Sequence, residues 1–321
     1  MLQDALPSSI TSSGYHRMTS RHVMQLTETG MHDKYWGALR PSLDVFKSTM
    51  TTVRAQLDHI VILVPHDLLA SPPSWLTNNF TISPGGVHAD GRTENRLILF
   101  SDGVYIELIA FTPGTSQADR ESHGWGKKPY GIVDYAFTLP PDNLDEVFES
   151  LRQQWRSTGV GEELIAAEPV QGGRTRPDGE VLKWKVATVG QEERGVANFW
   201  CFDVTPRHLR VPLSKEGTTH PSSSSGIASV QLDVHDESTL RELGKLFGAY
   251  LDGPKKGGRE FGISTPVKHA EGEGPKIRLG QAGAPQKQKA EIKIGFSSGG
   301  DGERKTVKGD IDGRTVVFEF V

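Results

Sequence analysis

The chain has 321 residues, of which 36% are hydrophobic and 24% are charged, and its formal net charge is -4. This length suggests about two domains with a core that needs neither disulfides nor structural metals. The acidic balance argues against nonspecific nucleic-acid binding, and no apolar run approaches the roughly 20 residues that cross a bilayer. The single cysteine, Cys201, excludes an internal disulfide and a cysteine-based zinc cluster. It is typical of a reducing compartment, so we expect a cytoplasmic protein.

Residues 1–50 mix Ser, Thr, Met and His with scattered charges and show neither strand alternation nor a helical stripe. We therefore expect a disordered N-terminal extension. A Ser-rich start that contains Arg also fits a transit peptide, but Asp4, Glu28, Asp33 and Asp44 argue against one, because such peptides avoid acidic residues.

The first predicted strand is the run Leu57–Val64, which is apolar and β-branched on both faces and ends at Pro65. Ser71, followed by a proline, begins a short helix. Two further strand-like runs, 96–100 and 104–111, are joined by a Ser-Asp-Gly turn. The predicted unit is thus strand, helix, then further strands.

The same order recurs along the chain. A strand at 131–139 precedes an amphipathic helical segment and two more strands, and a third round begins at Gly226. We expect a domain of two such units over 51–215 and a third, divergent unit over 226–321. Residues 252–289 are rich in Gly, Pro and Lys and predict a flexible insertion. Single units cannot bury their own faces, so the units should pair.

The repeat suggests a group of chemically active residues. Matching Val64-Pro65 to Leu139-Pro140 places His59 opposite Asp134, while Glu107 lies inside another apolar strand. Burying these side chains is costly unless a partner compensates them. A divalent cation would pair with all three, and a donor set without thiolates suits Mg, Mn, Fe, Ni or Zn. Alternatively, His59 and Glu107 form hydrogen bonds in the core.

Several stretches of the chain together carry a family resemblance: Leu57–Val61, Pro84–His88 with Thr93–Asn95, Tyr105–Ala110, and Gly173–Gly179 with Trp184. They resemble the glyoxalase-like domain proteins of the vicinal oxygen chelate (glyoxalase/bleomycin resistance/dioxygenase) superfamily. The resemblance covers about residues 55–205. It implies an α+β fold in which paired βαβββ modules form a curled mixed β-sheet half-barrel, with helices outside, around a metal ion. It also implies a metal-dependent isomerase, lyase or ring-opening/dioxygenase enzyme that chelates a small oxygenated metabolite through adjacent oxygens.

Within this resemblance His59 and Glu107 match the metal ligands of the first module. Asp134 occupies the first-strand ligand position of the second module. The family pattern has a polar ligand at the fourth position, which falls at about Phe202 in this chain and leaves Asp203 or Cys201 as imperfect substitutes. Three protein ligands would leave coordination positions open for water and substrate.

The remaining candidate site residues lie in the segments that carry the resemblance. Glu107 and His88 are the expected catalytic residues, with Glu107 able to act as a general base. Asn95, Arg176 and Trp184 are the expected substrate-binding residues. Each has a structural alternative: a solvated loop for His88, an ion pair with the adjacent Pro-Asp-Gly turn for Arg176, and the hydrophobic core for Trp184.

Two other kinds of protein remain open at this point. One is a non-catalytic protein of the same fold that binds or sequesters a small molecule. The other is a scaffold that uses the third unit as a docking surface. The expected partner is a small-molecule substrate rather than nucleic acid or a membrane, and formation of a homodimer is left open.

Overall fold

The computed structural model describes most of the chain that follows the N-terminal segment. The described residues are 54–140, 144–255, 258–268, 274–283, 288–298 and 305–321. All of them belong to one compact unit that spans residues 51–321. The extension predicted for residues 1–50 lies outside the described residues.

The first part of the fold consists of four strands of the main sheet and two short helices. In chain order they are β1 (Gln56–Leu63), α1 (His66–Ala70), α2 (Ser74–Thr77), β2 (Ser83–His88), β3 (Thr93–Leu99) and β4 (Tyr105–Phe111). β1 and β4 pair in parallel and are buried on both faces, as their continuous apolar sequences predict. β3 pairs with β4 in antiparallel register.

The order strand, helix, strand, strand, strand then occurs again. α3 (Gln117–Ser122) leads to β5 (Gly131–Thr138), α4 (Leu144–Ser157), β6 (Val170–Thr175), β7 (Val181–Ala187), β8 (Phe199–Asp203) and α5 (Arg207–Arg210), with 3-10 turns at Glu162–Leu164 and Gln191–Glu193. α4 packs Phe148 against Trp200 and Phe202 of β8. Because side chains alternate along a strand, Phe199 and Cys201 point to the opposite face of β8.

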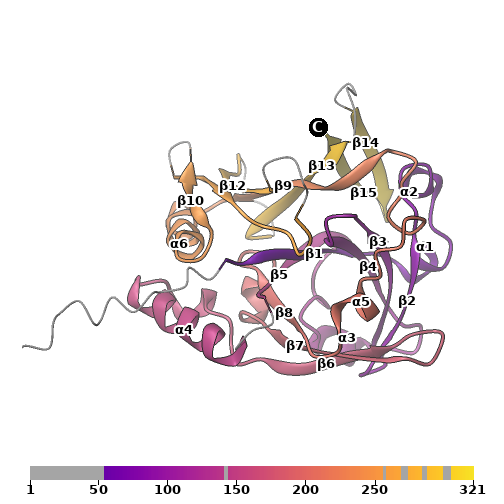
Figure 1. Ribbon diagram of the computed structural model, residues 1–321, viewed down its shortest axis with the longest axis horizontal. Helices are drawn as coiled ribbons and strands as arrows, with labels where there is room; N and C mark the ends of the chain where they lie inside the picture. Colours follow the sequence, from indigo (N-terminus) through magenta and orange to yellow (C-terminus); the bar gives the residue numbers. More distant parts are fainter. Residues whose placement is uncertain (1–53, 141–143, 256–257, 269–273, 284–287, 299–304) are drawn as a thin grey trace, which may run out of the picture. The chain divides into compact units, whose positions relative to one another are not determined.

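These eight strands form a closed barrel in the order β1-β4-β3-β2-β6-β7-β8-β5, whereas the family resemblance implies a curled half-barrel (Figure 1). The closure depends on a short ladder between β2 and β6, which pairs Val87 with Thr175 and His88 with Arg174. Gly86 permits this approach, because a Cβ atom there would lie 2.3 Å from the Thr175 carbonyl oxygen. The barrel therefore surrounds an interior around its whole circumference.

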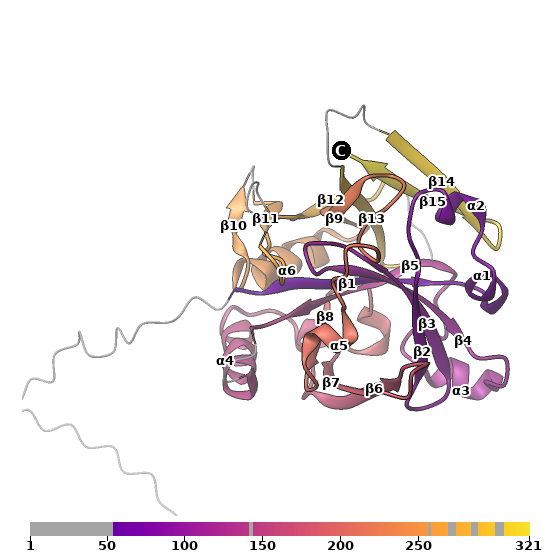
Figure 2. The same cartoon turned by 45° about the vertical axis from the view of Figure 1, so that its right-hand side comes forward.

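A second sheet lies beside the barrel, above it in Figures 1 and 2. Its elements are β9 (Ser224–Val234), α6 (Glu237–Gly248), β10 (Asp252–Lys255), β11 (Glu260–Gly262), β12 (Lys276–Gln281), β13 (Ala290–Ser298), β14 (Lys305–Ile311) and β15 (Arg314–Phe320). The strand order is β10-β11-β12-β9-β13-β15-β14. Three of these strands lie within 252–289, where the sequence predicts a flexible insertion. They are only three to six residues long, too short to show a period.

An aromatic seam joins the second sheet to the barrel. We use this name for the ring contacts among Phe80, Phe100, Phe296, Phe318, Phe320 and the imidazole of His220. Nδ1 of His220 accepts a hydrogen bond from the Thr81 amide at 3.1 Å, and its Nε2 lies 3.0 Å from the Leu99 carbonyl oxygen. The seam belongs to one continuous hydrophobic core, so the second sheet covers the outer face of the barrel.

In the part of the chain that the structure describes, no helix combines the length and the apolar character needed to span a membrane.

Candidate active site

A cavity of about 600 Å³ occupies the barrel interior. Residues of seven barrel strands line it, with β5 as the exception. Part of its wall comes from the segment after α3, where His123 and Trp125 lie, and from Arg210 of α5. A cavity of this size is in the range of small-molecule binding sites.

Glu107 of β4 occupies the polar part of this cavity and is only 6% exposed. Asn95 donates a hydrogen bond from Nδ2 to Oε1 of Glu107 at 2.6 Å. Nε2 of His88 lies 3.5 Å from the same oxygen, and Nε2 of His59 lies 3.8 Å from Oε2. The carboxylate is therefore flanked by an imidazole at each of its oxygens.

These neighbours determine the charge of Glu107. Burial raises the pKa of a carboxyl group, but here the contacts with His88, His59 and Asn95 outweigh burial and lower the pKa to about 2. Glu107 is consequently ionised at neutral pH.

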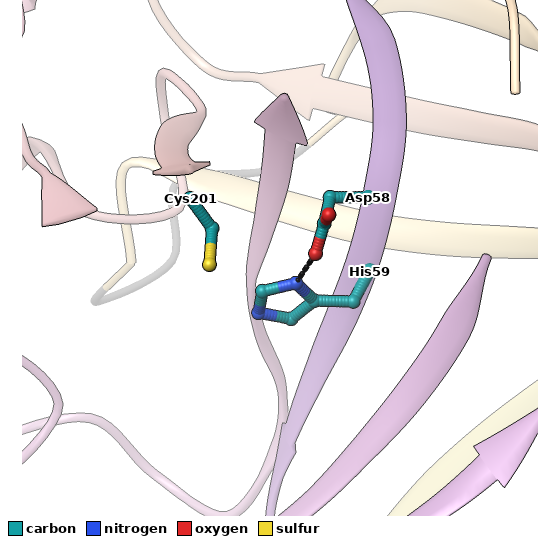
Figure 3. A group of neighbouring side chains, drawn as sticks. All are labelled: Asp58, His59 and Cys201. Atoms are coloured by element: carbon teal, nitrogen blue, oxygen red, sulfur yellow. Dashed lines mark hydrogen bonds and ion pairs between the residues drawn. The ribbon is translucent and has the colours of Figure 1, made fainter. Parts of the chain in front are cut away.

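Asp58 and His59 are adjacent on β1 but do not point to opposite faces. The ladder from β1 to β5 has a register shift that leaves Asp58 unpaired between Leu57 and His59. Nδ1 of His59 donates to Oδ1 of Asp58 at 2.5 Å, as Figure 3 shows. The proton on Nδ1 leaves Nε2 as the nitrogen that faces Glu107.

Two arginines of α5 hold Asp58 in its buried place behind His59. Arg207 donates to Oδ2 at 2.5 Å, and Arg210 donates to both carboxylate oxygens at 3.0 Å. Burial would raise the pKa of Asp58, but these guanidinium groups hold it well below its usual range. Asp58 is thus a fixed anion that orients His59.

Cys201 of β8 completes a group in which Asp58, His59 and the thiol each offer a donor atom within 4.8 Å of the others (Figure 3). This group is a poor cation site. Burial raises the pKa of the Cys201 thiol, so it stays protonated, and the charge of Asp58 is already compensated by two arginines. Phe202, the predicted fourth ligand position, faces α4 instead of the cavity.

Asp134 lies on β5 with its carboxylate fully buried. It accepts hydrogen bonds from Nε1 of Trp125 at 2.7 Å and from Nε of Arg194 at 2.5 Å. Those two side chains line the cavity, whereas Asp134 does not. Asp134 pairs with Val61 in the β1–β5 ladder, and its carboxylate is occupied by Trp125 and Arg194, which line the cavity in its place. The structure therefore does not bring Asp134 together with His59 and Glu107 on the cavity wall.

The predicted substrate-binding residues separate into two groups. Asn95 and Trp184 line the cavity together with His88, and the Trp184 ring packs edge-on against the His88 ring at 6.0 Å. Arg176 is outside the cavity wall, where it pairs with Asp178 at 2.6 Å. The neighbouring Arg174, which the sequence analysis does not single out, is the arginine of this motif that lines the cavity.

The comparisons with known proteins are consistent with this fold. Residues 57–247 match a family described as glyoxalase-like domain. No curated protein matches the sequence significantly. A hypothetical protein from Staphylococcus aureus is similar in structure, with a TM-score of 0.59 and 15% identity, over 83% of this chain and 99% of that one. At this identity the similarity shows a common fold and nothing about activity.

Two enzymes are more distantly similar. A variant of 4-hydroxymandelate synthase from Streptomyces coelicolor has a TM-score of 0.40 and 11% identity, over 76% of this chain and 71% of that one. Methylmalonyl-CoA epimerase from Mycobacterium tuberculosis has a TM-score of 0.33 and 15% identity, over 51% of this chain and 98% of that one. The family match is the informative one, because it spans more than half of the chain. This chain belongs to the glyoxalase-like domain family of the vicinal oxygen chelate superfamily.

Proposed function

We propose that this protein is a metal-dependent enzyme of the isomerase, lyase or ring-opening/dioxygenase type. Its substrate would be a small oxygenated metabolite that presents adjacent oxygens to the metal. The observation that carries this proposal is the buried, ionised Glu107 between the imidazoles of His59 and His88 in a cavity of about 600 Å³. Family membership agrees with it.

The donor set of His59 and Glu107 fits a divalent cation. Their facing atoms are 3.8 Å apart, which two ligands of one ion can span when each lies about 2.0–2.2 Å from it. Asp58 behind His59 supplies the carboxylate partner that metal-binding histidines usually have. His59 and Glu107 would hold the ion, which when bound would act as a Lewis acid toward the substrate oxygens. The choice among Zn, Mn, Fe, Ni and Mg stays open, and Asp134 takes no part.

We assign proton transfer to His88, because histidine is the commonest general acid–base residue and this one faces the cavity. Its Nδ1 is 2.7 Å from the Thr93 hydroxyl, which fixes the ring with Nε2 toward Glu107. Asn95 holds Glu107 in place. Trp125 and Trp184 supply apolar parts of the cavity wall beside this polar centre.

A second candidate, a binding or sequestering protein of the same fold without turnover, has one observation in its favour. Opposite the ligands from the first half of the barrel, the second half offers Ala136 and the protonated thiol of Cys201. This is a smaller ligand set than paired modules would predict.

Metal content separates the two candidates. In the enzyme, purified protein should hold about one equivalent of a divalent metal, and Glu107→Gln should lose it, because the amide keeps the volume but removes the charge. Glu94→Gln is a matched control, since Glu94 is also a strand carboxylate paired with a histidine, His66, but lies outside the cavity. Elemental analysis of the three proteins after dialysis is the measurement.

The enzyme assignment fails if the wild-type protein takes up no divalent metal, and the binding-protein candidate then stands. The ligand assignment fails if Glu107→Gln retains as much metal as Glu94→Gln. Melting temperatures of both variants show whether each has kept its fold.

A further inference from the structure

Arg174 of β6 is a buried cation on the cavity wall. The residue as a whole is 4% exposed. Its Nη1 is fully buried and has no hydrogen-bond partner among the described residues. A buried guanidinium nitrogen without a partner is costly, so such groups normally meet an anion or an acceptor.

The other arginines on this wall differ from Arg174 in one respect. Each is paired with a carboxylate: Arg92 with Asp90, Arg194 with Asp134, and Arg210 with Asp58 and Asp203. In the described part of the chain, no such ion pair involves Arg174. The cavity therefore presents one guanidinium group that makes no ion pair with a carboxylate of the described residues, although the charge of Glu107 in the same cavity acts on it electrostatically.

The position of Arg174 is fixed by the ladder that closes the barrel. It pairs with His88 across β2 and β6, so both side chains belong to the same stretch of wall. A Cβ atom on Gly86 would lie 3.5 Å from Nη1 of Arg174, an ordinary van der Waals distance, so the guanidinium packs next to β2 at Gly86. An anion bound to Arg174 would accordingly lie beside His88.

The wall around these polar groups is aromatic. The Trp184 ring lies over Gly172, where a Cβ atom would approach its Nε1 to 2.5 Å. Tyr105 stacks on the His59 ring with centroids 4.6 Å apart, and Phe199 packs edge-on against the same imidazole at 5.2 Å. Such surfaces favour an apolar or aromatic ligand body.

We infer that the ligand of this cavity is an organic monocarboxylate with an apolar or aromatic body, and that its carboxylate binds the guanidinium of Arg174. A guanidinium without an ion pair matches one negative charge, and guanidinium groups donate strong charge-assisted hydrogen bonds to carboxylates. The inference rests on the proposed function only in taking this ligand to be the substrate. Binding of a carboxylate by Arg174 does not itself need the metal.

The test uses metal-free protein, prepared with a chelator, and three probes: benzoate, phenylacetate and 3-phenylpropionate. Each acid is compared with its neutral amide, and binding is followed by the fluorescence of Trp125 and Trp184, which line the cavity. We expect at least one acid to bind at least about tenfold more tightly than its amide, because the acid adds a charge-assisted hydrogen bond. Arg174→Gln should abolish this preference.

Arg176→Gln is the matched control, since Arg176 is on the same segment, pairs with Asp178 and lies outside the cavity wall. It should retain the preference for the acid. Arg174→Lys, which keeps the charge without the fork, should bind the acid more weakly but still in preference to the amide, and it replaces Arg174→Gln if that variant does not fold.

Three results would overturn the inference: no binding of any acid by the wild-type protein, equal binding of acid and amide, or an undiminished preference in Arg174→Gln.

The stability of the ligand-free protein gives an independent readout. Without ligand, Arg174→Gln should melt at the same temperature as the wild type or higher, because it removes an unpaired buried cation. A clear fall in melting temperature would count against the inference. Metal content is measured separately, so a failure of the metal proposal leaves these results interpretable.

Discussion

Asp58 influences the cavity only through His59. Its carboxylate lies behind the His59 ring, fully buried between that imidazole and two guanidinium groups. The hydrogen bond to Nδ1 fixes both the tautomer and the orientation of the ring. A histidine held in this way presents Nε2 at a constant position, which suits a metal ligand better than a residue in free rotation.

The first prediction separates this positioning role from a metal site made of Asp58, His59 and Cys201. Asp58→Asn should weaken metal binding about 10–100-fold, because His59 loses its carboxylate partner. It should also destabilise the fold by about 3 kcal/mol, since Arg207 and Arg210 would then share only Asp203. Metal titration and chemical denaturation measure the two effects.

Cys201→Ala provides the contrasting variant. The thiol is buried and neutral, so its loss should cost about 1–2 kcal/mol of stability and leave metal content unchanged. If metal is lost in Cys201→Ala to the same extent as in Glu107→Gln, the thiol is a ligand and the assignment of His59 with Glu107 needs revision.

The sequence reveals polar residues in apolar strands, and for this reason His59 and Glu107 stand out. Asp58 is harder to interpret, because strict alternation would point it away from His59, and only the register shift of β1 turns both side chains the same way. The sequence likewise does not show what surrounds Asp134. Its partners, Trp125 and Arg194, come from segments without any repeat signal.

At the scale of elements, two glycine-containing strands determine the shape of the site. β2 and β6 pair over only two residue pairs, yet this ladder converts an open sheet into a barrel and places His88 across from Arg174. Without it the cavity would be a groove open along one side.

The second prediction concerns this closure. Gly86→Ala puts a Cβ atom 2.3 Å from the Thr175 carbonyl oxygen, so β2 and β6 must separate. We expect a loss of about 1–3 kcal/mol in stability and a weaker response of cavity tryptophan fluorescence to carboxylate probes. Gly114→Ala is the control, because a Cβ atom there meets open space and should leave both properties unchanged. Equal effects of the two substitutions would contradict the role given to the β2–β6 ladder.

β1, β4 and β5 can be predicted because burial on both faces produces continuous apolar runs. β2 and β6 cannot, since the sequences Ser83–His88 and Val170–Thr175 are rich in glycine and polar residues and resemble loops. Their strand structure comes from tertiary pairing, which a local pattern does not contain. Barrel closure was the part of the fold least accessible from the sequence for this reason.

At the scale of the whole molecule, the aromatic seam makes the second sheet part of the barrel's own core. His220 lies within the seam and is 5% exposed, with its Nδ1 accepting from Thr81 and its Nε2 facing the Leu99 carbonyl oxygen. These two contacts require the neutral ring with its proton on Nε2. Burial lowers the pKa of His220, although the bond to Leu99 opposes this shift.

The third prediction is a loss of stability in mild acid. A histidine whose pKa is lowered by folding binds more protons in the unfolded state, so stability is complete above the unfolded pKa of about 6.5 and falls as the pH drops below it. His123 acts in the same direction, because burial, with Arg92 and Arg194 nearby, lowers its pKa to about 4. His220→Gln should therefore reduce, without abolishing, the fall in melting temperature between pH 7 and pH 5.

The exposed His208 provides the control, since His208→Gln should leave the pH dependence as it is in the wild type. If the melting temperature of His220→Gln falls between pH 7 and pH 5 as much as that of the wild type, protonation of His220 does not contribute to the loss of stability in acid.

Helix α5 has only four residues, yet it lies between the last barrel strand and the connection to the second sheet, and it carries both guanidinium groups that hold Asp58. A chain ending at Asp203 would retain every strand of the barrel and lose the counter-charges behind His59. The smallest fragment that could preserve the chemistry must therefore contain α5 as well as the eight strands of the barrel. Transplanting the eight strands alone into another protein would transfer the cavity walls and leave the imidazole without its anchor.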